Sequence, residues 1–181
     1  MPKSRRALIV APDTGGDPTI ALWLWALDDA RQRTLAQLAD LPPTYLDWTP
    51  PAGGNSIGTL LYHLAAIEAD WLSAEVREEV PFAPKLVALF PYDVRDGAGR
   101  LRVVAGLTLA EHLARLATTR AELSRTFRAL APADFRRIRT LPDYDVTPEW
   151  VLHHLMQHEA GHRGEIGMIA ALAAHAGVAV G

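Results

Sequence analysis

Two histidines in the last third of the chain have the spacing of metal ligands. His158 and His162 are four residues apart in the segment WVLHHLMQHEAGHRGEI, which covers residues 150–166. In a helix, side chains at positions i and i+4 lie on the same face, so the two imidazoles can bind one divalent ion. The same residues spell HEAGH, the H-E-x-x-H pattern of zinc metalloproteases, in which Glu159 would be the general base. The motif therefore predicts a metal site, which could be either two helical histidines that share one ion or the zinc site of a metalloprotease.

The residues around the motif argue against a metalloprotease. The extended pattern H-E-x-x-H-x-x-G-x-x-H requires glycine at position 165 and histidine at position 168, where this chain has Glu165 and Met168. Another version takes a glutamate ligand from a later helix, but Glu165 is the last acidic residue, so we expect no third ligand there. A di-iron carboxylate bundle needs Glu-x-x-His on two helices, and only Glu159–His162 supplies it. The zinc metalloprotease remains the weaker alternative.

Four segments have the apolar periodicity of amphipathic helices. The predicted helices run from Pro18 to about Asp40, from Asn55 or Ser56 to about Glu79, from Thr108 to just before Pro132, and from Pro148 to about His175. Asp17 and Thr147 are expected N-caps before a first-turn proline, and Thr108–Glu111 is a capping box. The chain is therefore predicted to be all-α, with a loose N-terminal arm at residues 1–17 and a four-helix bundle at residues 18–177.

The link between the second and third predicted helices, Val80–Gly106, is unusually long. It has 27 residues, including Pro81, Pro84 and Pro91, whereas most helix–helix connections are much shorter. A helix of ~24 residues is about 36 Å long, a distance that such a link can cross. We therefore expect a long crossover that leaves these two helices parallel, giving an up-down-down-up bundle. A short strand near residues 101–104 is compatible with this link.

Two more histidines lie where they could join the pair. His154 precedes His158 by one helical turn, and His63 lies on the apolar stripe of the second helix between Leu60 and Ile67. A lone histidine on an apolar stripe is typically a hydrogen-bonded core residue. His63 facing the pair would instead complete a three-imidazole site with open positions, the arrangement of a catalytic metal. Spacing alone leaves both interpretations open.

Three stretches of the chain resemble one known family. They are WTPPAGGNSIGTLLYH at residues 48–63, TLAEHLARL at residues 108–116, and WVLHHLMQHEAGHRGE at residues 150–165. By their order and spacing, the chain is similar to the DinB/YfiT-like metal-binding four-helix bundles (DinB superfamily) from about residue 19 to residue 175. The resemblance implies that His63, His158 and His162 bind nickel, zinc or another divalent ion, with water in the open positions, in a protein that is often a homodimer.

The resemblance also bears on function. Characterised relatives include thiol-dependent transferases and isomerases that use a low-molecular-weight thiol such as bacillithiol or mycothiol. It therefore implies a divalent-metal-dependent enzyme, for example a thiol-dependent S-transferase that acts on small electrophiles, or a metal-dependent hydrolase. The alternative is a non-catalytic metal-binding or interaction bundle, because many members have no known substrate.

Residues around the histidines have candidate roles. His154 and Glu159 are candidate catalytic residues, and Arg163 is a candidate for binding an anionic cofactor or substrate. Each also has a structural interpretation: His154 as a buried, hydrogen-bonded histidine, Glu159 as the partner of a ligand imidazole or of a neighbouring helix, and Arg163 as one half of a salt bridge. Gly161 and Gly164 lower helix propensity on both sides of His162, which predicts close approach of another helix.

Composition limits the class of protein, the binding partners and the kinds of site that the chain can have. The 181 residues are 49% hydrophobic and 22% charged, as expected for one globular domain. The net charge of −3 provides no field for nucleic acid or anionic lipid, and the one dense basic cluster, Arg136, Arg137 and Arg139, is interpreted as a solvated loop. The absence of cysteine excludes disulfides, thiolate zinc sites and a catalytic cysteine.

No segment has the length of a targeting or membrane sequence. The apolar run at residues 7–11 is shorter than the about 7–15 residues of a signal-peptide core, and no run approaches the ~20 residues of a membrane span. We expect a cytoplasmic protein with a small-molecule substrate and without nucleic-acid or membrane partners. Trp23 and Trp25 give the first helix more apolar surface than one stripe needs, which predicts a homodimer.

Overall fold

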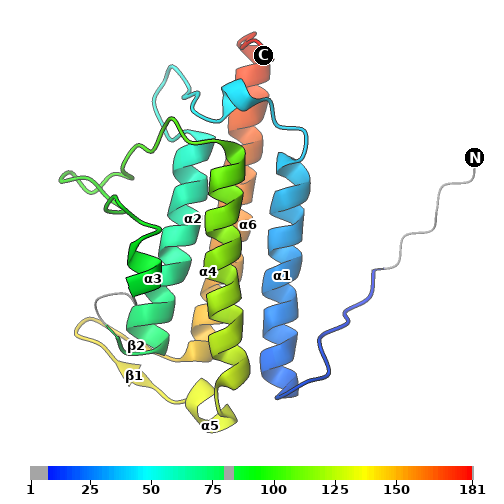
Figure 1. Ribbon diagram of the computed structural model, residues 1–181, viewed down its shortest axis with the longest axis vertical. Helices are drawn as coiled ribbons and strands as arrows, with labels where there is room; N and C mark the ends of the chain where they lie inside the picture. The colour runs from blue at the N-terminus through cyan, green and yellow to red at the C-terminus, as the bar shows by residue number, and fades with distance from the viewer. Residues whose placement is uncertain (1–7, 80–83, 181) are drawn as a thin grey trace, which may run out of the picture.

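Four long helices lie side by side in the computed structural model, which describes residues 8–79 and 84–180 (Figure 1). The elements in chain order are α1 (Pro18–Leu38), η1 (Pro43–Tyr45), α2 (Ile57–Trp71), η2 (Leu72–Val76), α3 (Pro84–Val87), α4 (Leu109–Ala129), α5 (Pro132–Phe135), β1 (Arg139–Thr140), β2 (Asp145–Val146) and α6 (Pro148–His175). The predicted all-α class is confirmed. Parts of the predicted arm (residues 1–7) and link (residues 80–83) lie outside the described residues.

The directions of the long helices can be followed in Figure 1 by colour. The chain runs upward in α1, downward in α2 and in α4, and upward again in α6. The connection between α2 and α4 returns to the upper end of the bundle and carries the short helix α3 on its way. The helix α1 packs mainly against α6, and α2 mainly against α4. A further interface joins α2 to α6, and it is this interface that holds the candidate site.

Polar side chains cap the helices where the sequence predicted helix starts. The Asp17 carboxylate accepts hydrogen bonds from two backbone N–H groups of the first turn of α1, and the Thr147 hydroxyl accepts one from the first turn of α6. The Ser56 hydroxyl does the same for α2, and Thr108 and Glu111 form the predicted capping box of α4. These bonds satisfy N–H groups that have no partner within the helix, which explains why the helices begin there.

The end of the second helix differs from the prediction. The α-helix stops at Trp71 and continues as the π-helical turn η2, Leu72–Val76. Shortly afterwards, Glu78 has a positive φ of 58°, a conformation that non-glycine residues seldom adopt. The π turn widens the helix by one residue per turn and buries Glu75, whose carboxylate accepts a hydrogen bond of 2.6 Å from the Tyr144 hydroxyl.

Four buried charged side chains, one from each long helix, meet in the core. Arg31 of α1 donates from Nε to Glu159 of α6 (2.7 Å) and from Nη2 to Glu68 of α2 (3.0 Å). Arg120 of α4 donates from Nε to Glu68 (2.8 Å) and from Nη2 to Glu159 (3.0 Å). Burial opposes the charge on Arg120, but the two carboxylates outweigh this and raise its pKa. This ion-pair network ties all four long helices together at one level.

A short hairpin precedes α6 and was not predicted. Strands β1 and β2 pair antiparallel, with Arg139 opposite Val146. In the long link, by contrast, the strand expected near residues 101–104 is reduced to a single bridge between Arg95 and Leu101.

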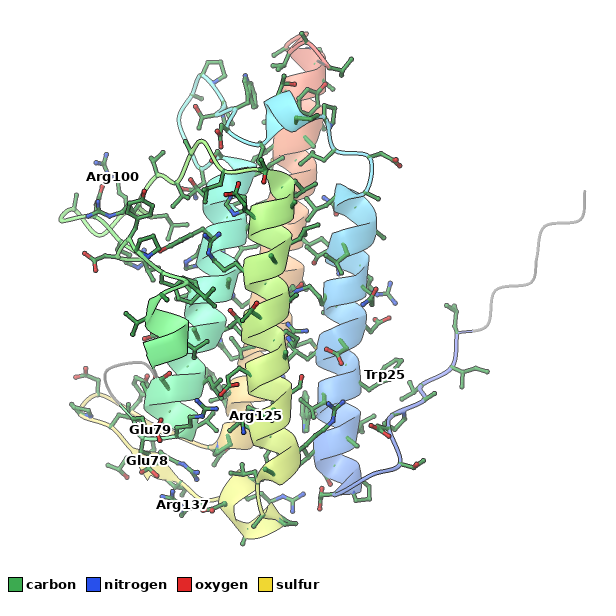
Figure 2. All side chains as sticks on the ribbon, in the orientation of Figure 1. Trp25, Glu78, Glu79, Arg100, Arg125 and Arg137 are labelled. Atoms are coloured by element: carbon green, nitrogen blue, oxygen red, sulfur yellow. The ribbon has the colours of Figure 1, made fainter. Side chains whose placement is uncertain are left out.

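The basic cluster is a solvated loop only in part, since Arg136 and Arg137 are exposed in the segment after α5 whereas Arg139 is not. Arg137 pairs with Glu78 at the lower end of the bundle (Figure 2), and Arg139 is buried and donates to backbone carbonyls.

No helix within the described ranges is both long enough and apolar enough to pass through a bilayer.

The glycines around His162 lie in open space rather than against another helix. A Cβ atom placed on Gly161 or Gly164 would meet no atom within 4 Å, so the predicted close approach at these positions is wrong. The close approach occurs one turn later, at Gly167, whose Cβ position lies 2.8 Å from Nε2 of Gln37 on α1.

This difference leads to a stability prediction. Replacing Gly161 or Gly164 with alanine should raise the free energy of unfolding by about 0.5–1 kcal/mol, because alanine costs less backbone entropy in a helix. Gly167→Ala is the matched comparison and should stabilise less, because it displaces Gln37 from its hydrogen bond with the carbonyl of Arg163 (3.1 Å). Urea unfolding of the three variants measures the difference. Equal gains at all three positions would show that the contact at Gly167 has no energetic effect.

Candidate metal centre

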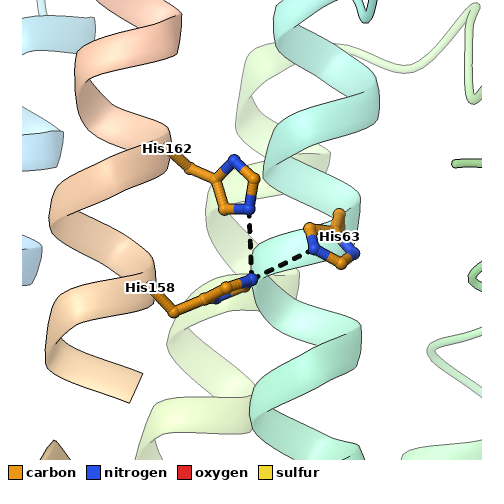
Figure 3. A group of neighbouring side chains, drawn as sticks. All are labelled: His63, His158 and His162. Carbon is orange, nitrogen blue, oxygen red and sulfur yellow. Dashed lines mark hydrogen bonds between the residues drawn. The ribbon is translucent and has the colours of Figure 1, made fainter. Parts of the chain in front are cut away.

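Three histidine side chains converge between α2 and α6. Figure 3 shows His63 projecting from α2 and His158 and His162 from α6, all toward one point. Nε2 of His158 lies 3.1 Å from Nε2 of His63 and 3.1 Å from Nε2 of His162. In a tetrahedral site with metal–nitrogen distances of about 2.0–2.1 Å, the nitrogens lie about 3.4 Å apart. The spacing therefore fits three ligands of one ion after a small adjustment.

Hydrogen bonding among the rings cannot satisfy the cluster equally well. A neutral imidazole has one N–H donor and one acceptor nitrogen. Nδ1 of His162 lies 3.2 Å from Oε2 of Glu165, and because a carboxylate only accepts, Nδ1 carries the hydrogen and Nε2 presents a lone pair. A single hydrogen on Nε2 of His158 can point at only one of its two neighbours. A cation at the centre would take a lone pair from each ring, so the donor set fits a divalent metal better than a chain of hydrogen bonds.

Burial keeps two of the rings neutral, which is the form that binds metal. It lowers the pKa of His63 to about 4, with smaller contributions from the charges of His162 and Arg95. It also lowers the pKa of His158 to about 3, helped by the neighbouring histidines. Both values lie well below the ordinary histidine value of about 6.5. At neutral pH, protons therefore compete little with a metal for these two nitrogens.

Glu165 orients one of the rings, a role that the sequence analysis missed. Its carboxylate holds Nδ1–H of His162 and so turns Nε2 toward the other histidines. Partners of this kind fix the tautomer of metal-binding histidines and make the ligand more basic. The spacing i, i+3 between His162 and Glu165 was a usable signal, since such residues are neighbours on a helix. His63 has no such partner: its Nδ1 is buried without a hydrogen bond in the described part of the chain.

Glu165→Ala should therefore weaken divalent-metal binding by about 10–100-fold, the usual cost of losing an orienting partner. Glu165→Gln should restore part of the affinity, because the amide oxygen still accepts a hydrogen bond. Competition with a chromogenic chelator measures the affinity. Gln157→Ala, an exposed position on the same helix, is the control and should bind metal like the unchanged protein. Wild-type affinity in Glu165→Ala would show that the contact with His162 has no influence on the metal.

His154 lies next to the cluster without joining it. Its ring stacks on that of His158 at 5.8 Å and on that of Trp150 at 5.1 Å, and lies 4.4 Å from the ring of Trp71. Burial, together with the charge of His153, lowers its pKa, so the ring is neutral at pH 7. It therefore has the position and the protonation state of a base beside the cluster.

The other two candidates are not brought to the histidines. Both oxygens of Glu159 accept hydrogen bonds from Arg31 and Arg120, so the structure places Glu159 in its structural role, as a buried ion-pair partner of neighbouring helices. The physical reason is helical rotation: Glu159 lies about 100° around α6 from His158 and faces the core. Arg163 follows His162 by the same rotation, and no contact of its guanidinium with the cluster is found in residues 8–79 and 84–180.

Comparisons with known proteins agree with this architecture. A family model described as the DinB superfamily matches residues 26–166, a range that includes all three histidines. No curated protein matches the chain. Among solved structures, the fold is similar to that described as the crystal structure of the conserved protein of locus from Enterococcus faecalis. That match has a TM-score of 0.66 and 15% sequence identity, and covers 85% of this chain and 96% of the other. At this identity the likeness bears on the fold alone.

Proposed function

Since the chain belongs to the DinB superfamily, we propose that it is a divalent-metal-dependent enzyme whose ion, nickel or zinc, is bound by His63, His158 and His162. The observation that carries the proposal is the convergence of three Nε2 atoms, with two 3.1 Å separations, from two different helices. Three protein ligands leave at least one position for water or a substrate, as in catalytic rather than structural sites.

The proposed reaction is the transfer of a small thiol to a small electrophile. A divalent ion held by these ligands would lower the pKa of a thiol at its open position, supplying a thiolate near neutral pH. His154 is proposed to accept the thiol proton, because it is neutral and its ring lies against that of His158. The sulfur then bonds to the electrophilic carbon, and the leaving group departs with its electron pair. Glu165 acts as a positioning residue through His162.

The proposal has further parts. It includes the up-down-down-up connection of the helices, supported by the directions in Figure 1, and a cytoplasmic protein with a small-molecule substrate. The role of Arg163 in binding an anionic thiol cofactor remains a prediction.

A homodimer is also proposed, although Trp23 uses its Nε1 to donate to Glu149 within the chain (3.2 Å). Light scattering at micromolar concentration measures the mass directly.

The test is a thiol–electrophile assay with the metal-loaded protein. 1-Chloro-2,4-dinitrobenzene serves as the electrophile, with bacillithiol, mycothiol, glutathione and cysteine compared as thiols. We expect one of the thiols to react faster than without protein, and the added rate to vanish in His158→Ala. His175→Ala, an exposed histidine at the end of α6, should keep the full rate. Stoichiometric metal without turnover for any thiol would instead support the non-catalytic metal-binding bundle.

A further inference from the structure

An open cavity of about 600 Å³ lies at the lower end of the bundle, where the β1–β2 hairpin meets the ends of α2 and α6. Its walls are formed by Trp71 at the end of α2, Trp150 in the first turn of α6, and residues 138 and 144–147 of the hairpin segment. The volume lies within the usual range of small-molecule sites. The cavity is separate from the three histidines, and nothing in the proposed reaction has used it so far.

Large apolar side chains are left exposed around this cavity. Ile138, Trp150 and Tyr144 are 62%, 46% and 44% exposed, and such clusters on one face mark binding sites more often than chance. The rings of Trp71 and Tyr144 lie 6.2 Å apart at 30°, and those of Trp71 and Trp150 lie 5.3 Å apart at 36°. These angles are shallow, so the three rings are nearly parallel to one another. A planar ring that is aligned with them can bind by offset stacking.

A row of stacked rings on α6 leads from the cavity toward the candidate metal-binding histidines. Trp150, His154 and His158 follow one another at four-residue intervals on α6. The ring of Trp150 stacks on His154 at 7°, and His154 stacks on His158 at 28°. Eight residues of α-helix span about 12 Å. A substrate whose ring lies in the cavity would have to extend about this far along the row of rings to place its reactive group at the cluster.

The charged side chain in the described lining is acidic. Asp145 lines the cavity, and the hydroxyl of Tyr144 is bound to the buried Glu75. No lysine or arginine is found in the described lining. The arginines on either side of Ile138 in the chain are already paired, Arg137 with Glu78 and Asp134, and Arg139 with backbone carbonyls. A negatively charged ligand would therefore meet the Asp145 carboxylate without a free cation and would bind less well than a neutral or positive one.

We propose that this cavity binds a planar aromatic group that carries no negative charge. The second part of the proposal rests on the proposed function. The aromatic group belongs to the electrophilic substrate, whose reactive carbon is directed past His154 to the histidine cluster. The proposed occupant is a small molecule, and a second copy of the chain on this surface is an outcome that the test distinguishes.

The test compares three ligands that share one ring system. Calorimetry with 1-naphthalenemethanol, 1-naphthylmethylammonium and 1-naphthalenesulfonate measures binding to the full chain. We expect the first two to bind and the sulfonate to bind at least 10-fold more weakly. Trp150→Ala should weaken the first two by about 10-fold, whereas Trp25→Ala, which lies on α1 away from the cavity, should not. Ile138→Ser, in the hairpin segment of the lining, provides a second variant that leaves the helices unchanged.

Several outcomes would overturn the inference. These are equal binding of the sulfonate, unchanged binding in both cavity variants, or a dimer that dissociates on Trp150→Ala and so places a second copy on this surface. Repeating the titration with His158→Ala separates the two proposals. If the naphthalenes bind that variant normally while the unchanged protein binds no metal, the proposed function fails and the aromatic site stands. If metal and thiol transfer are present but no naphthalene binds, only the aromatic site fails.

Discussion

Replacing His158 with alanine should reduce bound divalent metal from about one ion per chain to a trace, without unfolding the bundle. His158 is the central member of the cluster, since its Nε2 is the atom that lies 3.1 Å from both other rings. Its loss leaves two imidazoles on different helices, and two ligands do not hold such an ion against dialysis. Metal analysis after loading with zinc or nickel and dialysis measures the content, and circular dichroism reports the fold.

Two further variants make this result specific. His63→Ala should lose metal as His158→Ala does, because it removes the ligand that comes from the other helix. His175→Ala removes an exposed histidine from α6 and should retain the ion. Adding a chelator should lower the melting temperature of the unchanged protein but not that of His158→Ala, since a ligand that binds only the folded state stabilises it. Undiminished metal in His158→Ala would return these residues to the interpretation as core histidines.

The second large effect is expected at Glu159. Glu159→Gln keeps the shape of the side chain but leaves Arg31 and Arg120 with Glu68 as their only buried carboxylate. Removing one partner of a buried ion pair costs about 3–5 kcal/mol, because the remaining charge is desolvated without compensation. Urea unfolding should show a loss of that order, with the metal content of the folded fraction unchanged. A general base at the metal would give the opposite pattern: lost activity with little change in stability.

An exposed ion pair on the same bundle provides the control. Asp29→Asn removes the partner of Arg33 on the solvent side of α1, and exposed pairs of this kind contribute little. A loss at Glu159 as small as the loss at Asp29 would contradict the role of the buried network. If Glu159→Gln does not fold at all, Arg31→Met combined with Glu159→Met should recover folding, because removing both charges leaves no unpaired partner in the core.

The elements of this protein could largely be predicted from local sequence. Asp17, Thr108 and Thr147 begin helices because their side chains bond N–H groups two or three residues ahead, an interaction that needs no other part of the chain. The same holds for His158 and His162, whose i, i+4 spacing brings them together in any helix. The role of His63 was less clear from local sequence, since its position on an apolar stripe also fits a core histidine.

The contacts that each side chain makes outside its own helix depended on the tertiary structure. Glu159 has the place of a protease base in the motif, yet it pairs with Arg31 and Arg120, which are 128 and 39 residues away. The aromatic cavity likewise joins Trp71 to Trp150 through a hairpin that no pattern had predicted. Local patterns specify contacts within one or two helical turns, whereas the packing of the four helices decides which faces meet. For this reason local spacing was enough to find the candidate pair His158 and His162, and the family resemblance added His63, whereas the ion-pair network and the cavity required the folded chain.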